Sequence, residues 1–384
     1  MKRIAVVGGG IGGTIVANRI AEKLRTEMKT GEVEVTVFDR SEKHVYQPGQ
    51  LLVALGMEDP SAIVKEEREL LNPRVKFVYG SKGEVVRIDV SNHSIFTADG
   101  ASHQYDYLVI ATGSHNDWNL VPGLRETEFT AWDYEASIKM REALFNFGGG
   151  TAVINVARLP HKCPVGPLEL AMLFDDLARR KGVREKTEIV YTYPIKGVFG
   201  IPSVNAAMLK FFEERGIKVI SPFTVKTVDP QRKVLESEEG ETLKFDLLMG
   251  VPPAMGAKVI GDSGIGDRRN WVPADKFTLR MKDQSNVYVI GDATDIPISK
   301  AGSTADFESY IIAHNLVDDI RGNLGKRFYD GSVFCYVAMG QDKATYVRFN
   351  YTTPPNLPPP SYVHWWGKLL YNRLYWTVTA KAVV

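Results

Sequence analysis

The stretch that decides the fold lies near the N-terminus and reads Ile4-Ala5-Val6-Val7-Gly8-Gly9-Gly10-Ile11-Gly12-Gly13. Its first four residues are typical of a buried strand, and a helical pattern follows from Thr14 to Arg25. Between them, Gly8, Gly10 and Gly13 fit the spacing G-x-G-x-x-G. The first glycine permits a tight turn, the second lets a pyrophosphate approach the backbone, and the third lets helix pack on strand. Gly12 is taken as a further contact. The helix N-terminus would offer its free N–H groups to the phosphates.

The next strand is predicted over Glu34–Asp39 and ends in an acid. Asp39 lies somewhat further beyond Gly13 than the usual spacing of about 20 residues, and it is expected to bind the ribose hydroxyls. Strand, glycine turn, helix, strand and acid in this order predict a Rossmann-type fold. Three later residues are candidate contacts of the same ligand: Arg40, Gln47 and Val85.

Two later segments indicate which dinucleotide is bound. Tyr107–Gly113 is a buried-strand run that ends in Ala111, Thr112 and Gly113, and Val287–Asp292 is another that ends in Gly291 and Asp292. They resemble the A-T-G and G-D segments of flavoprotein reductases with two dinucleotide folds, in which the aspartate bonds to the ribityl chain of FAD. For Gly291-Asp292 alone, a simple turn is the alternative. The resemblance implies FAD and a discontinuous FAD domain made of residues 1–115 and 270–325.

Residues 116–269 look like a second copy of the same fold, and three pairs of segments correspond: Arg3–Val7 with Thr151–Asn155, Val33–Asp39 with Thr187–Tyr193, and Tyr105–Gly113 with Phe245–Pro253. The second copy lacks the cofactor residues. Its first strand is followed by Val156–Pro164 without G-x-G-x-x-G, and its second ends in Tyr193-Pro194 without an acid. Side chains would meet a pyrophosphate at this turn, so nicotinamide is not expected as the electron donor. The prediction is an α/β chain of two tandem Rossmann-like domains, the second without a nucleotide site.

A cysteine stands where the second glycine loop would be. Cys163 lies between prolines in Pro160-His161-Lys162-Cys163-Pro164, and a helix is predicted from Leu168 or Glu169. His161, Lys162 and the helix N-terminus are expected to favour its thiolate, which is the reactive form. The only other cysteine, Cys335, lies far along the chain. From the residues alone it is either a partner of Cys163 or a small buried hydrophobe in a strand.

Taken together, these motifs resemble the sulfide:quinone oxidoreductase family over the whole chain. The resemblance rests on the glycine turn, the A-T-G segment, the loop around Cys163, Phe199–Ser203, Gly291–Lys300 and Phe334-Cys335. It implies that Cys163 and Cys335 are redox cysteines at the flavin, and that Lys300 lies near the pyrimidine edge and stabilises the anionic reduced ring. Many members carry a third cysteine that can bind the flavin covalently. This chain has no cysteine before Cys163, so its FAD is expected to be non-covalent.

The resemblance also implies the reaction. Sulfide would be oxidised to sulfur or polysulfide at the cysteine pair, and two electrons would pass through FAD to a membrane quinone. Three alternatives remain open: an NADH:quinone oxidoreductase, the flavoprotein subunit of a sulfide:cytochrome c reductase, and a non-catalytic flavin- or sulfur-binding membrane protein. The chain could also form a homo-oligomer.

Composition excludes other classes of partner. The formal net charge of +1 gives no electrostatic case for nucleic acid, and no metal site is expected. No apolar run reaches the length of about 18 residues that a spanning helix needs. Since a strand is predicted directly after Met1-Lys2-Arg3, no signal peptide is expected. The protein is therefore expected at the cytoplasmic face of a membrane.

The tail offers a means of reaching that membrane. Five residues recur at every fourth position and share one helical stripe: Tyr362, Trp366, Leu370, Leu374 and Val378. The polar residues His364, Lys368 and Asn372 lie on another side. Aromatic and basic residues on an amphipathic segment are typical of an interfacial anchor, so residues 326–384 are predicted to face the quinone and the lipid bilayer. The alternatives are a helix that covers the protein's own core and an oligomer contact.

Overall fold

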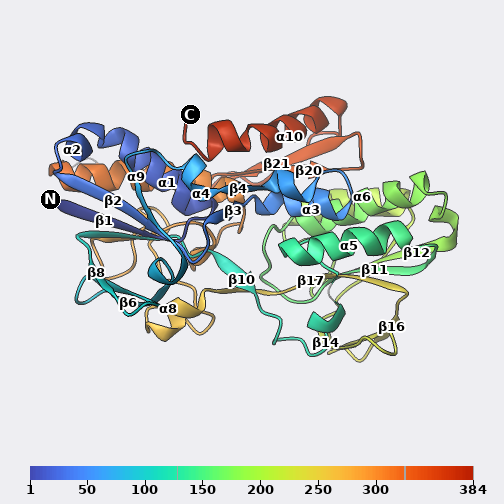
Figure 1. The fold of residues 1–384 in the computed structure, drawn as a ribbon. Coiled ribbons are helices and arrows are strands. Elements are labelled where there is room, and N and C mark those ends of the chain that lie inside the picture. Colours follow the sequence, from blue (N-terminus) through green and yellow to red (C-terminus); the bar gives the residue numbers. More distant parts are fainter. Residues whose placement is uncertain (128, 324–325, 384) are drawn as a thin grey trace.

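The structure, a computed structural model, describes residues 1–127, 129–323 and 326–383. Its first half is built on a parallel sheet of order β19-β9-β1-β2-β5 (Figure 1). The strands are β1 (Lys2–Val7), β2 (Val33–Phe38), β5 (Lys76–Val78), β9 (Tyr107–Ile110) and β19 (Val287–Val289). Helices α1 (Ile11–Lys23) and α9 (Gly302–Arg321) pack together on one face of this sheet. Helix α1 starts before the predicted Thr14, because the glycine turn leads directly into it.

The second half repeats this plan. Its parallel sheet has the order β13-β12-β11-β17, so β17-β11-β12 corresponds to β9-β1-β2 of the first sheet. The strands are β11 (Gly150–Val156), β12 (Thr187–Thr192), β13 (Ile217–Ile220) and β17 (Leu247–Val251), and the helices are α5 (Tyr134–Asn146), α6 (Gly166–Arg180) and α7 (Pro202–Glu214). The two tandem folds predicted from the sequence are thus confirmed.

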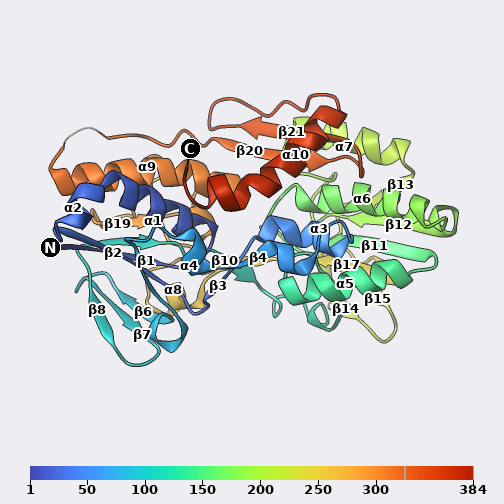
Figure 2. The same ribbon diagram turned by 45° about the horizontal axis from the view of Figure 1, so that its top comes forward.

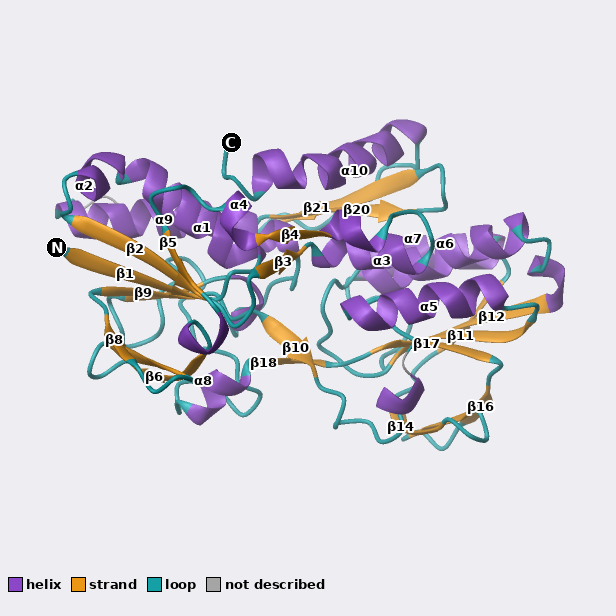
Figure 3. Cartoon of the chain, in the orientation of Figure 1, coloured by secondary structure: helices purple, strands orange, loops and turns teal. Residues whose placement is uncertain are grey.

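Each half also carries a three-stranded antiparallel sheet on the side away from its long helices (Figure 3). The strands are β6 (Val85–Asp89), β7 (Ser94–Thr97) and β8 (Ser102–Gln104) in the first half, and β14 (Val225–Asp229), β15 (Val234–Ser237) and β16 (Thr242–Lys244) in the second. All three strands of the second set follow their counterparts at the same offset along the chain, the one that separates Val85 from Val225. This part of the repeat was not predicted, although the sequence shows the constant offset.

The chain passes into the second fold at β10 (Ser114–Asn116) and returns at β18 (Ala254–Gly256), and these two strands pair antiparallel. Shorter elements complete the structure: α2 (Arg25–Lys29), β3 (Lys43–Val45), α3 (Gln50–Ala54), β4 (Val64–Glu66), α4 (Glu67–Leu70) and α8 (Lys258–Asp262). Because β19 lies in the first sheet, the chain after the second fold returns to the first.

The C-terminal region lies over both halves. It consists of the antiparallel pair β20 (Val333–Ala338) and β21 (Ala344–Phe349), then α10 (Tyr362–Leu374) and a π-helical turn at Tyr375–Thr379. Figure 2 shows α10 beginning over the second half and the chain end reaching α9 of the first. Within the described residues, no helix is both long and apolar enough to cross a bilayer.

Candidate active site

The glycine turn after β1 has the geometry that its spacing predicts. A β-carbon on Gly13 would lie 1.8 Å from the Gly8 carbonyl oxygen, so only glycine lets α1 approach the strand this closely. Gly8 itself has φ +108°, in the region that favours glycine. A β-carbon on Gly10, by contrast, would meet no atom of the described chain within 4 Å. The turn therefore presents open backbone at Gly10, and no described side chain caps the α1 N-terminus.

The remaining predicted contacts of this turn differ in their surroundings. Asp39 directly follows β2, and its carboxylate accepts hydrogen bonds from the Gly9 amide at 2.6 Å and the Ser41 amide at 2.8 Å. Gly12 faces Ile290, 3.3 Å from its would-be β-carbon, so its small size serves the packing of α1. The other predicted contacts comprise the exposed residues Arg40 and Gln47 and the buried Val85 at the start of β6.

The A-T-G and G-D segments follow two adjacent strands of the first sheet, β9 and β19. The Ala111 amide bonds to the Val7 carbonyl, and the buried Thr112 hydroxyl has no hydrogen-bond partner in the described chain. A β-carbon on Gly113 would meet no described atom within 4 Å. Asp292 accepts a hydrogen bond from the Ser114 hydroxyl at 2.8 Å.

These residues fit FAD. Open backbone at Gly10 and an uncapped helix N-terminus suit a pyrophosphate, Asp39 suits a ribose, and Thr112 offers a buried hydroxyl that lacks a partner. Buried polar groups are nearly always hydrogen-bonded, so an unpartnered hydroxyl beside open backbone indicates a ligand. With FAD bound, Gly8–Gly13 would hold the pyrophosphate, and Asp292 would face the ribityl chain.

The loop that carries Cys163 is fixed on both sides. The Cys163 amide donates to the Lys300 carbonyl at 2.9 Å, and its own carbonyl accepts from the Gly166 amide at 2.9 Å. Cys163 has φ +51°, which a non-glycine residue seldom adopts and which often marks functional sites. Helix α6 begins at Gly166, just before the predicted start, because this turn already bonds into the helix. The thiol therefore lies just before a helix N-terminus.

Cys335 reaches the same region from β20. Its Sγ lies 3.8 Å from the Ser303 hydroxyl at the start of α9, and both free thiols pack against one hydrophobic core. Cys335 is also among the groups that raise the pKa of Cys163. The fold thus brings together two cysteines that lie in opposite halves of the sequence.

The expectation that the loop favours a thiolate at Cys163 is wrong. Burial raises the pKa of Cys163 far above its usual range, and the Glu169 carboxylate raises it further. Burial also raises the pKa of Cys335 to about 11. His161 cannot help, because burial lowers its pKa to about 4 and leaves the ring neutral near pH 7. The Lys162 ammonium, whose pKa is lowered by burial, lies 3.3 Å from Gln47.

Two charged residues near the thiols were missed by the sequence analysis. Glu169, in the first turn of α6, is buried and accepts from the Ala338 amide at 2.7 Å and from the Lys368 ammonium at 2.6 Å. Glu169 raises the pKa of both thiols and Lys368 lowers it. The sequence shows no signal that pairs them, since they lie 199 residues apart. The tail thereby supplies a cation, Lys368, that lowers the pKa of both thiols.

Substituting Glu169 by glutamine should therefore make Cys163 more reactive at a given pH. The change removes the largest charge that holds the pKa of Cys163 up, and it frees Lys368 to lower that pKa. Alkylation of the reduced protein by iodoacetamide, followed against pH, should shift to lower pH. Below the pKa, the rate should rise about tenfold for each pKa unit lost.

Glu185→Gln, at an exposed position beyond the far end of α6, is the matched control and should leave the profile unchanged. An unshifted profile in Glu169→Gln would show that this carboxylate does not act on the thiol.

Lys300 lies next to the Cys163 loop and the G-D turn, and its ammonium is bonded to backbone carbonyls of the protein. It donates to the Asp292 and Thr294 carbonyls, both at 3.0 Å, and lies 3.8 Å from the centre of the Trp271 ring. Burial lowers its pKa, while Asp292 and Glu308 raise it. Glu308 is itself buried against the Gly291 amide at 2.5 Å, and burial raises its pKa to about 8. Lys300 thus connects the G-D turn to the Cys163 loop.

Comparison with known proteins places this geometry in a family. The family model "Pyridine nucleotide-disulphide oxidoreductase" matches residues 2–315. The mitochondrial sulfide:quinone oxidoreductase of Mus musculus is 28% identical over 92% of this chain and 79% of its own length. That of Dictyostelium discoideum is 27% identical over 91% and 78%. The crystal structure of the sulfide:quinone oxidoreductase of Aquifex aeolicus superposes with a TM-score of 0.86 at 21% identity, over 99% of this chain and 92% of that one. The chain belongs to the pyridine nucleotide-disulphide oxidoreductase family.

Proposed function

We propose that this protein is an FAD-dependent sulfide:quinone oxidoreductase. One observation carries the proposal: the turn that would hold a nicotinamide cofactor's phosphates in the second fold presents Cys163, which the fold brings to Cys335. The relatives named as sulfide:quinone oxidoreductases, which match more than nine tenths of the chain, support it. FAD is the cofactor, bound without a covalent link.

NADH is disfavoured as the donor by the β11–α6 turn. The turn spans Ala157–Val165, and the buried side chains of His161 and Val165 lie within it. A pyrophosphate needs open backbone at a helix N-terminus, as at Gly10 in the first fold. At the position just after β12 that corresponds to Asp39, where an acid would bind the ribose, the chain carries the buried Tyr193 instead.

The cysteine pair and its polar neighbours have different roles in the proposed reaction. Hydrosulfide attacks the oxidised cysteine pair, one S–S bond breaks, and one cysteine becomes a persulfide while the other leaves as a thiolate. Because the pocket opposes a free thiolate, the released sulfur is driven to react onward. Lys368 and the Ser303 hydroxyl stabilise it, since both lower the pKa of Cys335. When bound, FAD would supply the acceptor for the two electrons released as the pair closes again around the added sulfur, and would pass them on to a quinone. Lys300 and Asp292 hold the turn on which the flavin would lie.

We further propose that α10 lies on the membrane. Its predicted apolar stripe is exposed at Tyr362 (56%), Trp366 (69%), Leu370 (57%) and Leu374 (40%). Its polar side faces inward, where Lys368 bonds to Glu169 and Asn372 to Tyr46. Trp365 and Leu369 also face inward and pack on the core, so α10 covers the core with one side and leaves this apolar stripe exposed on another. The exposed stripe fits a peripheral protein that draws quinone from the bilayer.

Serine at both Trp366 and Leu370 should weaken binding to lipid vesicles at least about tenfold, because two large apolar side chains leave the lipid. Co-sedimentation with vesicles measures this. Serine at both Leu120 and Ile195, which are exposed by 45% and 43% away from α10, is the control and should leave binding unchanged. Equal binding by both double variants would contradict the assignment of this stripe to the membrane.

Steady-state turnover tests the choice of acceptor. With sulfide as donor, a short-chain quinone should be reduced by the purified protein, and cytochrome c should not. Reduction of cytochrome c without quinone would favour the second enzyme class, and no reduction of either acceptor would favour a non-catalytic binding protein.

A further inference from the structure

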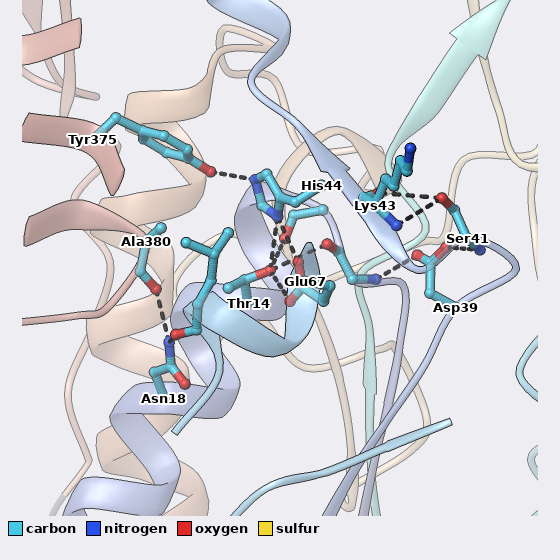
Figure 4. Close-up of polar contacts among 12 residues, drawn as sticks. Thr14, Asn18, Asp39, Ser41, Lys43, His44, Glu67, Tyr375 and Ala380 are labelled. Carbon is cyan, nitrogen blue, oxygen red and sulfur yellow. Dashed lines mark hydrogen bonds and ion pairs between the residues drawn. The ribbon is translucent and has the colours of Figure 1, made fainter. Parts of the chain in front are cut away.

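A buried chain of hydrogen bonds connects the glycine turn to the C-terminal tail (Figure 4). It runs from Thr14 in α1 through Glu67 and His44 to Tyr375 in the π-helical turn, and each of these side chains is at most 1% exposed. The Thr14 hydroxyl lies 2.7 Å from Glu67 Oε1, His44 Nδ1 lies 2.7 Å from Glu67 Oε2, and His44 Nε2 lies 2.6 Å from the Tyr375 hydroxyl. The reaction proposed above uses none of them.

The protons of this chain can be assigned from its acceptors. Glu67 has two carboxylate oxygens, so Thr14 donates to one and His44 Nδ1–H to the other. With Nδ1 protonated, His44 Nε2 accepts a hydrogen bond from the Tyr375 hydroxyl. Removing one member leaves a buried polar atom without a partner, which is costly in a dry interior. The arrangement is therefore held as a unit.

At its other end the chain touches the backbone that would hold the pyrophosphate. The Thr14 amide donates to the Gly10 carbonyl at 2.9 Å, and its hydroxyl lies 2.9 Å from that carbonyl and 3.1 Å from the Gly9 carbonyl. A shift of Glu67 would move Thr14, and Thr14 would move the Gly9 and Gly10 peptides. These are the peptides beside the open space of the turn.

A second bond ties the same face of α1 to the tail. Asn18 lies one helical turn after Thr14 and on the same side. Its amide nitrogen donates to the Ala380 carbonyl at 2.7 Å and to the Leu70 carbonyl at 2.9 Å. Ala380 is fully buried. The tail is thus fixed at Ala380 to the helix whose N-terminus forms the cofactor turn.

We propose that Thr14, Glu67, His44 and Tyr375 are positioning residues that couple the FAD-binding turn to the tail, so that FAD affinity and tail docking depend on each other. Such coupling is reciprocal by thermodynamic necessity. The inference rests on FAD as the cofactor of the proposed function, but not on sulfide or quinone. In the bound protein, a docked tail fixes the turn, and an occupied turn fixes the tail that reaches the membrane.

The rate of FAD release from the holoenzyme, followed by flavin fluorescence after dilution, tests the coupling. Tyr375→Phe should release FAD about fivefold faster or more, within the usual range of coupling between sites. Tyr46→Phe is the matched control, because Tyr46 stacks on Tyr375 and its hydroxyl also bonds to the tail, at Asn372, outside the chain to Thr14. It should release FAD at the wild-type rate. The same acceleration in both variants would indicate general loosening of the tail and overturn the coupling.

Hydrogen exchange on the holoenzyme tests the reverse direction. Thr14→Val should speed exchange of the backbone amides of residues 375–383, and Thr14→Ser, which keeps the hydroxyl, should restore protection. If Tyr375→Phe does not fold, Thr14→Val and Thr14→Ser still test the coupling. Wild-type exchange in Thr14→Val, or wild-type FAD release in Tyr375→Phe, would overturn the proposal. Neither measurement uses sulfide or quinone, so loss of sulfide oxidation in an otherwise coupled protein would count only against the proposed function.

Discussion

Replacing Cys163 by serine should abolish reduction of the bound flavin by sulfide while FAD stays bound. Serine keeps the size of the side chain but cannot form the bond that hydrosulfide attacks or carry the added sulfur. The rate of flavin bleaching under anaerobic conditions should fall by at least about 10³-fold, the scale expected when the reacting group of a covalent mechanism is lost. The FAD spectrum should be retained, because Cys163 lies outside the glycine turn.

Cys335→Ser should give the same loss, since each thiol needs the other. Ser303→Ala is the matched control: it removes one hydroxyl beside Cys335 Sγ and leaves both sulfurs in place. Its bleaching rate should change by less than about tenfold, because a single hydrogen bond contributes on the order of 1 kcal/mol. Normal reduction in either cysteine variant would remove the cysteine pair from the mechanism.

The second large effect is expected at Gly10. A β-carbon there would meet no described atom within 4 Å, and the backbone angles of φ −83° and ψ −168° suit any N-cap residue. Gly10→Asp should therefore fold, and its carboxylate should even cap α1. The same side chain would occupy the N–H groups meant for the pyrophosphate and repel its charge. FAD affinity should fall ~100-fold or more, by the loss of the anion site at the helix N-terminus.

Titration with FAD and thermal unfolding without added flavin separate these effects. Gly148→Asp is the control, since Gly148 precedes β11, away from the first turn, and also has open space around it. It should leave FAD affinity unchanged. A Gly10→Asp protein that binds FAD as tightly as the wild type would show that the pyrophosphate does not lie against Gly10.

The sequence predicted the parts of the fold that depend on local chemistry. G-x-G-x-x-G, its flanking strand and helix, and the second copy without the motif all require particular residues at fixed spacing, so a single chain reveals them. The β6–β8 and β14–β16 sheets follow the same repeat, with one offset for all three strands. They were missed only because they carry no motif.

The properties of the site that depend on burial could not be predicted in this way. His161 stands close to Cys163 in the sequence, yet burial keeps its ring neutral near pH 7. Glu169, in the first turn of the following helix, and the distant Lys368 act on the pKa of Cys163 instead. The tail stripe at Trp366 and Leu370 was predicted correctly as a stripe. The bond between Lys368 and Glu169 on the inward side could not be predicted, because that partner comes from the tertiary fold.

The central claim is that sulfur has replaced a nicotinamide cofactor as the electron donor, with Cys163 standing where the second nucleotide turn would be. Anaerobic stopped-flow mixing of the purified protein with sulfide and, separately, with NADH tests this most directly through the flavin absorbance near its visible maximum. The account predicts rapid bleaching by sulfide and none by NADH at equal concentration. Bleaching by NADH, with a flavin that sulfide leaves oxidised, would contradict it.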